Sequence, residues 1–242
     1  MELVGKVAIV TGGAVRLGRA LSLALAEHGV RLGIHYGSSA GPARALVKEI
    51  EARGGEAVAI QADLSRPGET SSIVRRAADR YAYVDILVNN AAIFEPGNLD
   101  DTTPESWDRQ FAINLTAPFF LCQAFAAHVG RERAGHIVSI ADWRGIRPGT
   151  DYMAYRLTKA GIIAMTRSLA LALAPNIQVN AIAPGLILPP PGRDQGYLER
   201  KAANVPLRRV GSPEAIAAAL VFLLRSDFVT GEIISVTGGE QL

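Results

Sequence analysis

Cysteine, strong net charge and long apolar runs are all scarce in this chain of 242 residues. Its single cysteine, Cys122, cannot form an internal disulfide, and its apolar setting, PFFLCQAF, indicates a buried position in a helix. The 25 basic and 23 acidic residues nearly cancel, and the basic ones are scattered, which argues against a nucleic-acid or membrane-surface partner. The longest apolar run, Ala215–Leu224, is too short to span a bilayer. No leader-like pattern opens the chain, so we expect a soluble protein of the reducing cytoplasm.

What the chain has in quantity is apolar sequence, at 49% of residues, and it is patterned as alternating strands and helices. We expect strands at Val7–Val10, Leu32–Tyr36, Ala57–Ala62, Asp85–Val88, His136–Ile140, Gln178–Ile182 and Ile233–Val236. We expect helices at Leu17–Glu27, Pro42–Arg53, Glu69–Tyr81, Glu105–Val129, Tyr152–Ala174 and Pro213–Leu224. This rhythm predicts an α/β fold with a doubly wound parallel sheet, in a single domain spanning residues 1–242. The proline-rich segment 186–205 is expected to be a substrate loop.

A glycine-rich turn, VTGGAVRLG, follows the first expected strand and leads into the first helix. Gly12 and Gly18 occupy the first and third positions of the usual three-glycine spacing, but the middle position holds Arg16. Backbone N–H groups and a helix N-terminus at such a turn favour an anion, so the sequence predicts a phosphate site. Taken alone, the two glycines could equally be a tight turn. Their place at the carboxyl end of the first strand favours a nucleotide cofactor.

A second pair of residues points to proton chemistry. Tyr155 and Lys159 are four apart in a long helical pattern, so they share one helix face. A nearby ammonium favours the phenolate, so we expect Lys159 to lower the pKa of Tyr155 toward neutrality. Alone, the pair could also be a solvated helix face.

Taken together, the motifs resemble the short-chain dehydrogenase/reductase family over the whole chain. They are TGGAVRLG, QADLS with Asp63, NNAA at Asn89–Ala92, FAINLT with Asn114, YRLTK at Tyr155–Lys159, APG at Ala183–Gly185, and VTGEIISVTGG. The resemblance implies a Rossmann-like fold, a nicotinamide cofactor and hydride transfer. It also implies that Tyr155 is the catalytic acid, that Lys159 binds the nicotinamide ribose, and that Asn114 holds a proton-relay water.

The resemblance further implies which residues contact the cofactor. Asp63 would contact adenine, Asn90 would lie along the adenosine ribose, and Asn89 would tie neighbouring strands together. The full set of expected cofactor contacts is Gly12, Arg16, Leu17, His35, Tyr36, Ser38, Ser39, Asp63, Leu64, Asn90, Ala91, Tyr155, Lys159, Pro184, Gly185 and Ile187. No metal ligand set is expected.

One position departs from the family pattern in a way that bears on the substrate. The family's catalytic serine lies thirteen residues before the tyrosine, and here that residue is Asp142; Ser139 belongs to the strand. An ionised aspartate cannot donate a hydrogen bond to a developing alkoxide, so it suits a substrate that presents N–H groups, or it must be protonated. The alternative is a degraded active site, against which the retained Asn114, Tyr155 and Lys159 argue.

The pteridine reductases, a branch of the family, are similar to this chain at three unusual positions. They carry an arginine before the Leu-Gly pair, as at Arg16, an aspartate in place of the serine, as at Asp142, and a pterin-stacking phenylalanine, as at Phe94. The resemblance implies substrate contacts from Arg16, Phe94, Asp142 and Tyr155. Arg16 could instead bind only phosphate, and Phe94 could only pack under a loop. The branch often has serines where Ala92 and Ile93 stand here.

The cofactor's phosphate is predicted separately. An NAD site needs an acidic residue after the second strand to hold the ribose diol, and residues 34–43 contain none. His35, Ser38 and Ser39 can donate to a 2′-phosphate beside Tyr36, so NADP is expected. The related branch often has an arginine where Ser38 stands.

We therefore expect an NADPH-dependent reductase of a pteridine of the dihydrobiopterin, dihydromonapterin or dihydrofolate type. The alternatives are a 3-oxoacyl or general carbonyl reductase and, from another class, an NADP-binding sensor without turnover. The helices Glu105–Val129 and Tyr152–Ala174 are apolar on both sides, and the resemblance implies that they pair subunits into a homotetramer.

Overall fold

The computed structural model describes residues 1–190, 192 and 194–242, which are built around one parallel sheet. Its seven strands lie in the order β3-β2-β1-β4-β5-β6-β7, and every neighbouring pair is parallel. The strands are β1 (Val7–Val10), β2 (Arg31–Tyr36), β3 (Ala57–Gln61), β4 (Ile86–Asn89), β5 (Gly135–Ile140), β6 (Ile177–Pro184) and β7 (Ile233–Val236). The predicted doubly wound α/β sheet is confirmed.

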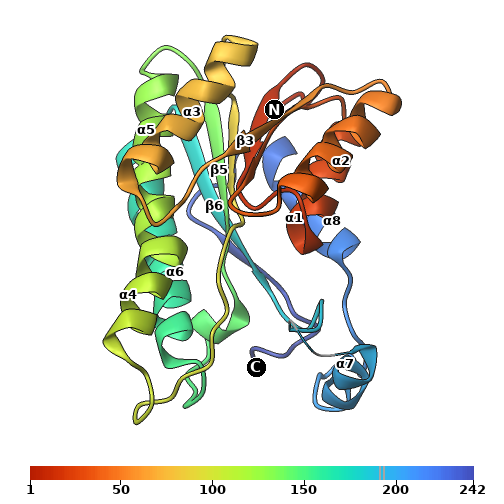
Figure 1. Ribbon diagram of the computed structural model, residues 1–242, viewed down its shortest axis with the longest axis vertical. Coiled ribbons are helices and arrows are strands. Elements are labelled where there is room, and N and C mark those ends of the chain that lie inside the picture. Colours follow the sequence, from red (N-terminus) through yellow and green to blue (C-terminus); the bar gives the residue numbers. More distant parts are fainter. Residues whose placement is uncertain (191, 193) are drawn as a thin grey trace.

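Helices cover both faces of the sheet, as Figure 1 shows, with α1, α2 and α8 on one side and α3 to α6 on the other. The α-helices are α1 (Arg16–Glu27), α2 (Ala40–Ala52), α3 (Pro67–Tyr81), α4 (Pro104–Phe111), α5 (Ala117–Val129), α6 (Met153–Leu173), α7 (Gln195–Ala202) and α8 (Pro213–Arg225). A π-helical turn, η1 (Ala112–Thr116), joins α4 to α5, and a 3-10 turn, η2 (Trp143–Gly145), follows β5.

The sequence builds this arrangement from fully apolar central strands and capped helices. All residues of β1 and β4 are buried, as a strand covered on both faces requires. Helix α8 begins with Pro213 after Ser212, whose hydroxyl accepts a hydrogen bond from the Ala215 amide at 3.3 Å. Leucines of α1 and α8 pack against one face of the sheet, and side chains of α3 and α5 pack against the other.

The expected long helix Glu105–Val129 is continuous in direction but not in hydrogen bonding. The π-helical turn η1 interrupts it and carries Asn114. Single π-turns inside α-helices are frequent at functional sites. By length and composition alone, the stretch Pro104–Val129 is also long and apolar enough to cross a membrane. In the fold, its α5 part packs against the core side chains of α3.

The predicted substrate loop 186–205 is only partly a loop. Residues Gln195–Ala202 form helix α7, whose N-cap Asp194 accepts a hydrogen bond from the Tyr197 amide at 3.0 Å. The sequence pattern around the prolines concealed this short helix. Pro191 and Arg193 lie outside the described residues. Figure 1 shows α7 below the carboxyl ends of the strands, near the C-terminus.

The strand order reverses between β1 and β4, and this switch point determines where a ligand can bind. The connection after β1 leads to α1, and the connection after β4 leads to α4, so a crevice opens at the carboxyl ends of the two strands. Asn89, the last residue of β4, donates through Nδ2 to the Ser139 hydroxyl of β5 at 3.4 Å. The predicted strand-tying role of Asn89 is confirmed.

Candidate active site

The turn between β1 and α1 is shaped to bring backbone close to an anion. Gly12 has φ +59°, and a Cβ on Gly18 would lie 2.1 Å from the Gly12 carbonyl oxygen, so no larger residue fits there. Helix α1 begins after Val15, which offers no side-chain cap, and its first turn contains no acidic residue. The first N–H groups of α1 therefore remain available to a phosphate.

Arg16 occupies this turn in a backbone conformation that glycine usually supplies. Its φ is +52°, in the left-handed region that costs a side chain of this kind on the order of 1–3 kcal/mol. The guanidinium Nη2 donates a hydrogen bond to the Pro189 carbonyl at 2.6 Å. Arg16 thus extends from the phosphate turn to the segment that precedes α7.

Thr11 and Asn90 fasten this turn to the end of β4. The Thr11 hydroxyl accepts from the amides of Asn90 and Ala91 at 2.9 and 3.0 Å. The Asn90 side chain donates back to the Thr11 carbonyl at 2.8 Å and to the Gly12 carbonyl at 3.3 Å. The two loops at the switch point therefore form one rigid unit.

The expected phosphate contact of His35 is wrong. Its side chain is buried under the turn, with the residue only 2% exposed. Nδ1 accepts from the Gly12 amide at 3.2 Å, and Nε2 lies 3.1 Å from the Ala62 carbonyl, to which it donates. Burial lowers the pKa of His35, so the ring is neutral and supports the turn instead of donating to a phosphate.

The other residues expected at the adenosine end surround the carboxyl ends of β2 and β3. Ser38 is exposed, while Tyr36 and Ser39 are half-buried. Ser39 is the N-cap of α2 and makes no capping hydrogen bond through its side chain, so its hydroxyl is available to a ligand.

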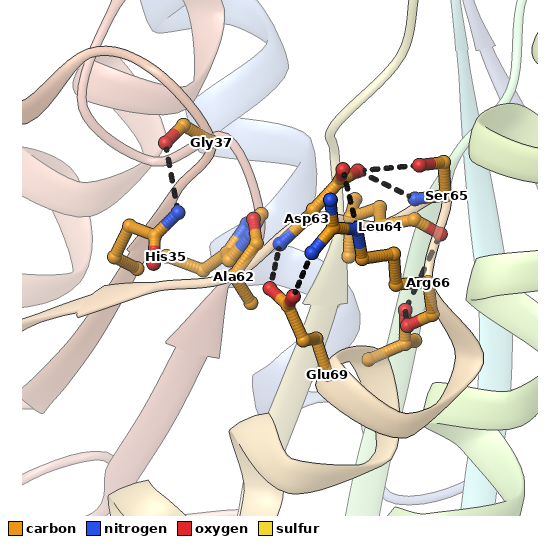
Figure 2. A network of polar contacts seen from close by, with 10 residues as sticks. His35, Gly37, Ala62, Asp63, Leu64, Ser65, Arg66 and Glu69 are labelled. Atoms are coloured by element: carbon orange, nitrogen blue, oxygen red, sulfur yellow. Dashed lines mark hydrogen bonds and ion pairs between the residues drawn. The ribbon is translucent and has the colours of Figure 1, made fainter.

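Asp63 is held in place by a small polar network, which Figure 2 shows. Its Oδ1 accepts from the Ser65 amide at 2.9 Å and from the Ser65 hydroxyl at 2.7 Å. Arg66 lies 3.5 Å from Oδ2 and also pairs with Glu69, which in turn accepts from the Asp63 amide at 2.8 Å. The Ser65 hydrogen bonds, above all, lower the pKa of Asp63, so its carboxylate is ionised. The neighbouring Leu64 is buried in the core under α3.

Asp142 and Tyr155 meet at the carboxyl end of β5. The Tyr155 hydroxyl donates to Asp142 Oδ2 at 2.9 Å, and the Arg144 amide donates to Oδ1 at 2.8 Å. Burial raises the pKa of Asp142. Burial also raises the pKa of Tyr155 well above its usual value, and the charge and the acceptor oxygen of Asp142 raise it further. The expectation that Lys159 would lower the pKa of this phenol is therefore wrong, because burial and Asp142 dominate.

Lys159 lies one helical turn beyond Tyr155 and faces the same cavity. Its Nζ donates to the Ile140 carbonyl at 2.7 Å and lies 5.6 Å from the centroid of the Tyr155 ring. Burial lowers the pKa of Lys159 to about 8. Asn114 approaches from η1, with Oδ1 accepting from the Ile93 amide and Nδ2 donating to the Ile93 carbonyl, both at 2.9 Å.

Phe94 lies next to Tyr155. Its ring is nearly perpendicular to that of Tyr155, with centroids 4.7 Å apart, and stacks on Tyr152 at 4.1 Å with planes 10° apart. Tyr152 is the N-cap of α6 and has φ +53°, so a strained backbone presents its ring to Phe94. One face of Phe94 is therefore already occupied by an aromatic partner.

These groups line one cavity of about 620 Å³. Among the predicted site residues, it brings together Gly12, Arg16, Leu17, Asn90, Ala91, Phe94, Asp142, Tyr155, Lys159, Pro184, Gly185 and Ile187. The predicted residues outside its lining are His35, Tyr36, Ser38, Ser39, Asp63, Leu64 and Asn114. The volume suits a cofactor end together with a small heterocycle or acyl chain.

Four functional candidates escaped the sequence reasoning. Trp143, Arg144 and Glu240 line the cavity, and Tyr152 stacks on Phe94. The position of Tyr152, directly before α6 and three residues before Tyr155, could have indicated it. Glu240 carried no such signal, because it comes from the C-terminal tail after β7.

Comparison with known proteins places these features in a family. The sequence profile described as enoyl-(acyl carrier protein) reductase matches residues 13–241. An L-rhamnose 1-dehydrogenase (NAD(P)(+)) from Sphingomonas sp. is 35% identical, with 98% of this chain and 96% of that protein covered. A 3-oxoacyl-[acyl-carrier-protein] reductase from Synechocystis sp. is 33% identical, with 98% and 97% covered.

Solved structures are similar over the same length. The FolM alternative dihydrofolate reductase 1 from Brucella canis, complexed with NADP, has a TM-score of 0.95 and 33% identity, with 99% of this chain and 95% of that chain covered. A short-chain dehydrogenase from Burkholderia cenocepacia in complex with NADP has a TM-score of 0.93 and 34% identity, and both chains are fully covered.

Proposed function

The chain belongs to the short-chain dehydrogenase/reductase family, and we propose that it is an NADPH-dependent reductase of a pteridine of the dihydrobiopterin, dihydromonapterin or dihydrofolate type. The observation that carries this proposal is the hydrogen bond from Tyr155 to Asp142 at the position of the family's serine. The predicted family membership is confirmed. The likeness to a FolM alternative dihydrofolate reductase supports the substrate class.

NADP is the cofactor that the site fits. The uncapped start of α1 receives the pyrophosphate, and the acid-free stretch after β2 leaves Ser38 and Ser39 for the 2′-phosphate. Asp63 contacts the adenine and Asn90 lies along the adenosine ribose. Lys159 reaches the nicotinamide ribose, and Pro184, Gly185 and Ile187 line the nicotinamide end of the cavity. When bound, NADPH supplies the hydride.

The chain's own residues supply the proton. A C=N bond that gains hydride at carbon needs one proton at nitrogen, and Tyr155 keeps its proton across the physiological range because its pKa is raised. Asp142 orients the Tyr155 hydroxyl, and its ionised carboxylate can accept a hydrogen bond from an N–H of the substrate ring. In its protonated form, Asp142 can instead deliver the proton through a water. Lys159 stabilises the phenolate that remains after transfer, and Asn114 holds the relay water by which the phenol is reprotonated.

Phe94 and Arg16 complete the proposed substrate contacts. Phe94 holds the pterin ring against the nicotinamide. Arg16 contacts the pyrophosphate and borders the substrate from the phosphate turn, and its hydrogen bond to Pro189 holds the segment before α7 over the cavity.

A 3-oxoacyl reductase is the second candidate, because a curated relative of that activity covers almost the whole chain. Ketone reduction builds negative charge on oxygen, and a buried carboxylate beside that oxygen repels it. Asp142 therefore disfavours this reaction unless it is protonated.

One assay separates these functions. NADPH oxidation is measured with dihydrobiopterin, dihydromonapterin, dihydrofolate and an acetoacetyl thioester at equal concentrations. We expect turnover of at least one dihydropteridine to exceed turnover of the thioester. Preference for the thioester favours the 3-oxoacyl reductase, and NADPH binding without any oxidation favours the sensor.

We also propose a homotetramer in the cytoplasm. Phe119 and Phe120 of α5 and Leu157 of α6 are exposed apolar side chains on the two helices expected to pair subunits. Covering them in a symmetric assembly removes apolar surface from water. Light scattering at micromolar concentration should give about four times the monomer mass of 25.7 kDa, and a monomeric mass would contradict the proposal.

A further inference from the structure

Two charged side chains face the cavity with hydrogen-bonding atoms that no described residue uses. They are Arg144, in the turn after β5, and Glu240, in the C-terminal tail. Arg144 Nε and Glu240 Oε2 are both buried from solvent and have no partner among the described residues. Each such atom costs stability, so its retention calls for an explanation.

Arg144 is held in place by rings instead of by hydrogen bonds. The Cζ of its guanidinium lies 4.8 Å from the ring centroid of Trp143, 5.6 Å from that of Phe94 and 5.8 Å from that of Tyr152. Its nearest carboxylate oxygen, Oδ1 of Asp142, is 3.8 Å away, which is too far for a hydrogen bond. A planar cation is thus fixed by aromatic faces, while its Nε–H donates to no residue in the described part of the chain.

Glu240 closes the cavity from the tail. A Cβ on Gly185 would lie 2.7 Å from the Thr237 Cα and 2.8 Å from Oε2 of Glu240, so the carboxylate packs closely against the backbone that follows β6. Burial raises the pKa of Glu240, whereas the charge of Arg144 and a hydrogen bond from the Leu186 backbone lower it, so the carboxylate feels the charge of Arg144. They form no ion pair within 4.0 Å in the described part of the chain, so neither charge is neutralised by direct contact with the other.

We propose that Arg144 and Glu240 together recognise the substrate, as a pair that we call the reading pair. They bind one edge of an uncharged ring, on which a carbonyl group lies beside an N–H group. Arg144 donates to the carbonyl oxygen, and Glu240 accepts from the N–H. The 4-oxo and N3–H groups of a 2-amino-4-oxopteridine form such an edge, so this inference rests on the proposed function and names what recognises its substrate. Arg16 also lines the cavity, but it already donates to Pro189.

The charges around Arg144 also favour a neutral ligand edge with one acceptor and one donor. An anionic group at Arg144 would also face the carboxylates of Asp142 and Glu240, whereas a neutral lactam edge satisfies one donor and one acceptor at once. A ketone or acyl thioester offers an acceptor to Arg144 but no N–H to Glu240. A site built around buried polar groups discriminates strongly against a ligand that leaves one unpaired.

The test compares two pteridines that present opposite hydrogen-bonding patterns at this edge of the ring. In 2,4-diaminopteridine, an amino donor replaces the 4-oxo acceptor, and N3 becomes an acceptor. Dissociation constants for it and for 2-amino-4-oxopteridine are measured on the NADP⁺-loaded protein by pteridine fluorescence. The variants are Arg144→Met and Glu240→Gln, with Arg75→Met, an exposed residue of α3, as the matched control.

We expect the parent and Arg75→Met to bind the 4-oxo compound at least about tenfold more tightly than the diamino compound. In Arg144→Met and Glu240→Gln, the preference should fall below about threefold, mainly through weaker binding of the 4-oxo compound. Their affinity for NADP⁺ should match that of the parent, which shows that they are folded. If Arg144→Met loses NADP⁺ affinity, Arg144→Lys replaces it, because a point charge without the planar fork should also lose part of the preference.

Unchanged preference in both variants would overturn the inference, and so would a parent that binds neither compound or prefers the diamino one. These outcomes are separate from the fate of the proposed function. If the protein turns over a dihydropteridine but both variants keep the parent's preference for the 4-oxo compound, the reading pair is contradicted and the proposed reductase function stands. If the parent prefers the 4-oxo compound and the variants lose that preference, but no dihydropteridine is turned over, the reductase proposal is contradicted and the reading pair stands.

Discussion

The Tyr155 hydroxyl donates a 2.9 Å hydrogen bond to Oδ2 of Asp142, so the two side chains form one proton-handling unit. The contact joins the end of β5 to the first turn of α6. It raises the pKa of the phenol in addition to the effect of burial, and it leaves Tyr155 as a proton donor at neutral pH.

Replacing Tyr155 by Phe should abolish turnover while leaving NADPH binding nearly intact. The hydroxyl acts mainly in the transition state, and removing a general acid typically costs about 10²–10⁴ in rate. Single-turnover kinetics and an NADPH titration check the two halves. A Tyr155→Phe variant that keeps more than about a tenth of the parent's kcat would mean that Asp142 and water deliver the proton.

NADPH should bind more tightly than NADH, and Ser38→Arg should widen the difference. Ser38 is exposed beside the start of α2, and residues 34–43 offer hydroxyls but no carboxylate. A guanidinium there adds a charge-assisted contact to the 2′-phosphate, which should lower the Kd of NADPH by about tenfold and leave that of NADH unchanged. Both constants are measured at one salt concentration. Equal binding of the two cofactors by the parent, or tighter binding of NADH, would contradict the predicted NADPH preference.

His136 should make the protein less stable in mild acid. It is 4% exposed, and burial, assisted by the charges of the amino terminus and Lys6, lowers its pKa from 6.5 to about 4. As the pH falls, His136 therefore takes up a proton in the unfolded chain before it does so in the folded protein. The free energy of unfolding is consequently unaffected by this residue above pH 6.5 and decreases as the pH falls from 6.5 to about 4. The loss amounts to about 3 kcal/mol when complete.

His136→Leu removes this titration and also removes a ring nitrogen, Nδ1, that has no partner among the described residues. Urea unfolding at pH 7.5 and pH 5 should show a smaller drop in the free energy of unfolding for the variant than for the parent. Equal drops would show that other groups carry the acid sensitivity.

Local pattern was enough to predict most of the fold. The alternation of apolar strands with amphipathic helices predicts the sheet, because a strand buried on both faces must be apolar throughout. Helix α7 was missed because its eight residues follow a proline-rich stretch and carry little apolar periodicity. The π-turn η1 was missed because hydrogen-bond spacing inside a helix leaves no mark on the apolar pattern.

The candidate site was predicted where motifs specify it and missed where tertiary packing decides. Position along the chain placed Asp142 opposite Tyr155, and the structure brings them together. Sequence could not tell that His35 turns inward under Gly12, since a histidine at a strand end can face either way. The sequence also could not predict that Glu240 lines the cavity, because its position there depends on how the C-terminal tail folds back.

Replacing Asp142 by Ser is the change that separates pteridine reduction from ketone reduction. It restores the donor that a developing alkoxide needs and removes the carboxylate that an N–H edge needs. We expect Asp142→Ser to lose dihydropteridine reduction and to keep or gain activity on activated ketones. The alkaline limit of the remaining activity should also move to lower pH. The charge and the acceptor oxygen of Asp142 raise the pKa of Tyr155, so their loss lowers that pKa, and the proton donor is lost earlier as pH rises. Initial rates between pH 6 and 10 with both substrate classes measure this, beside Asp142→Asn, which keeps the shape without the charge. Should Asp142→Ser reduce dihydropteridines as well as the parent does, the aspartate has no substrate-specific role and the carbonyl reductase becomes the better interpretation.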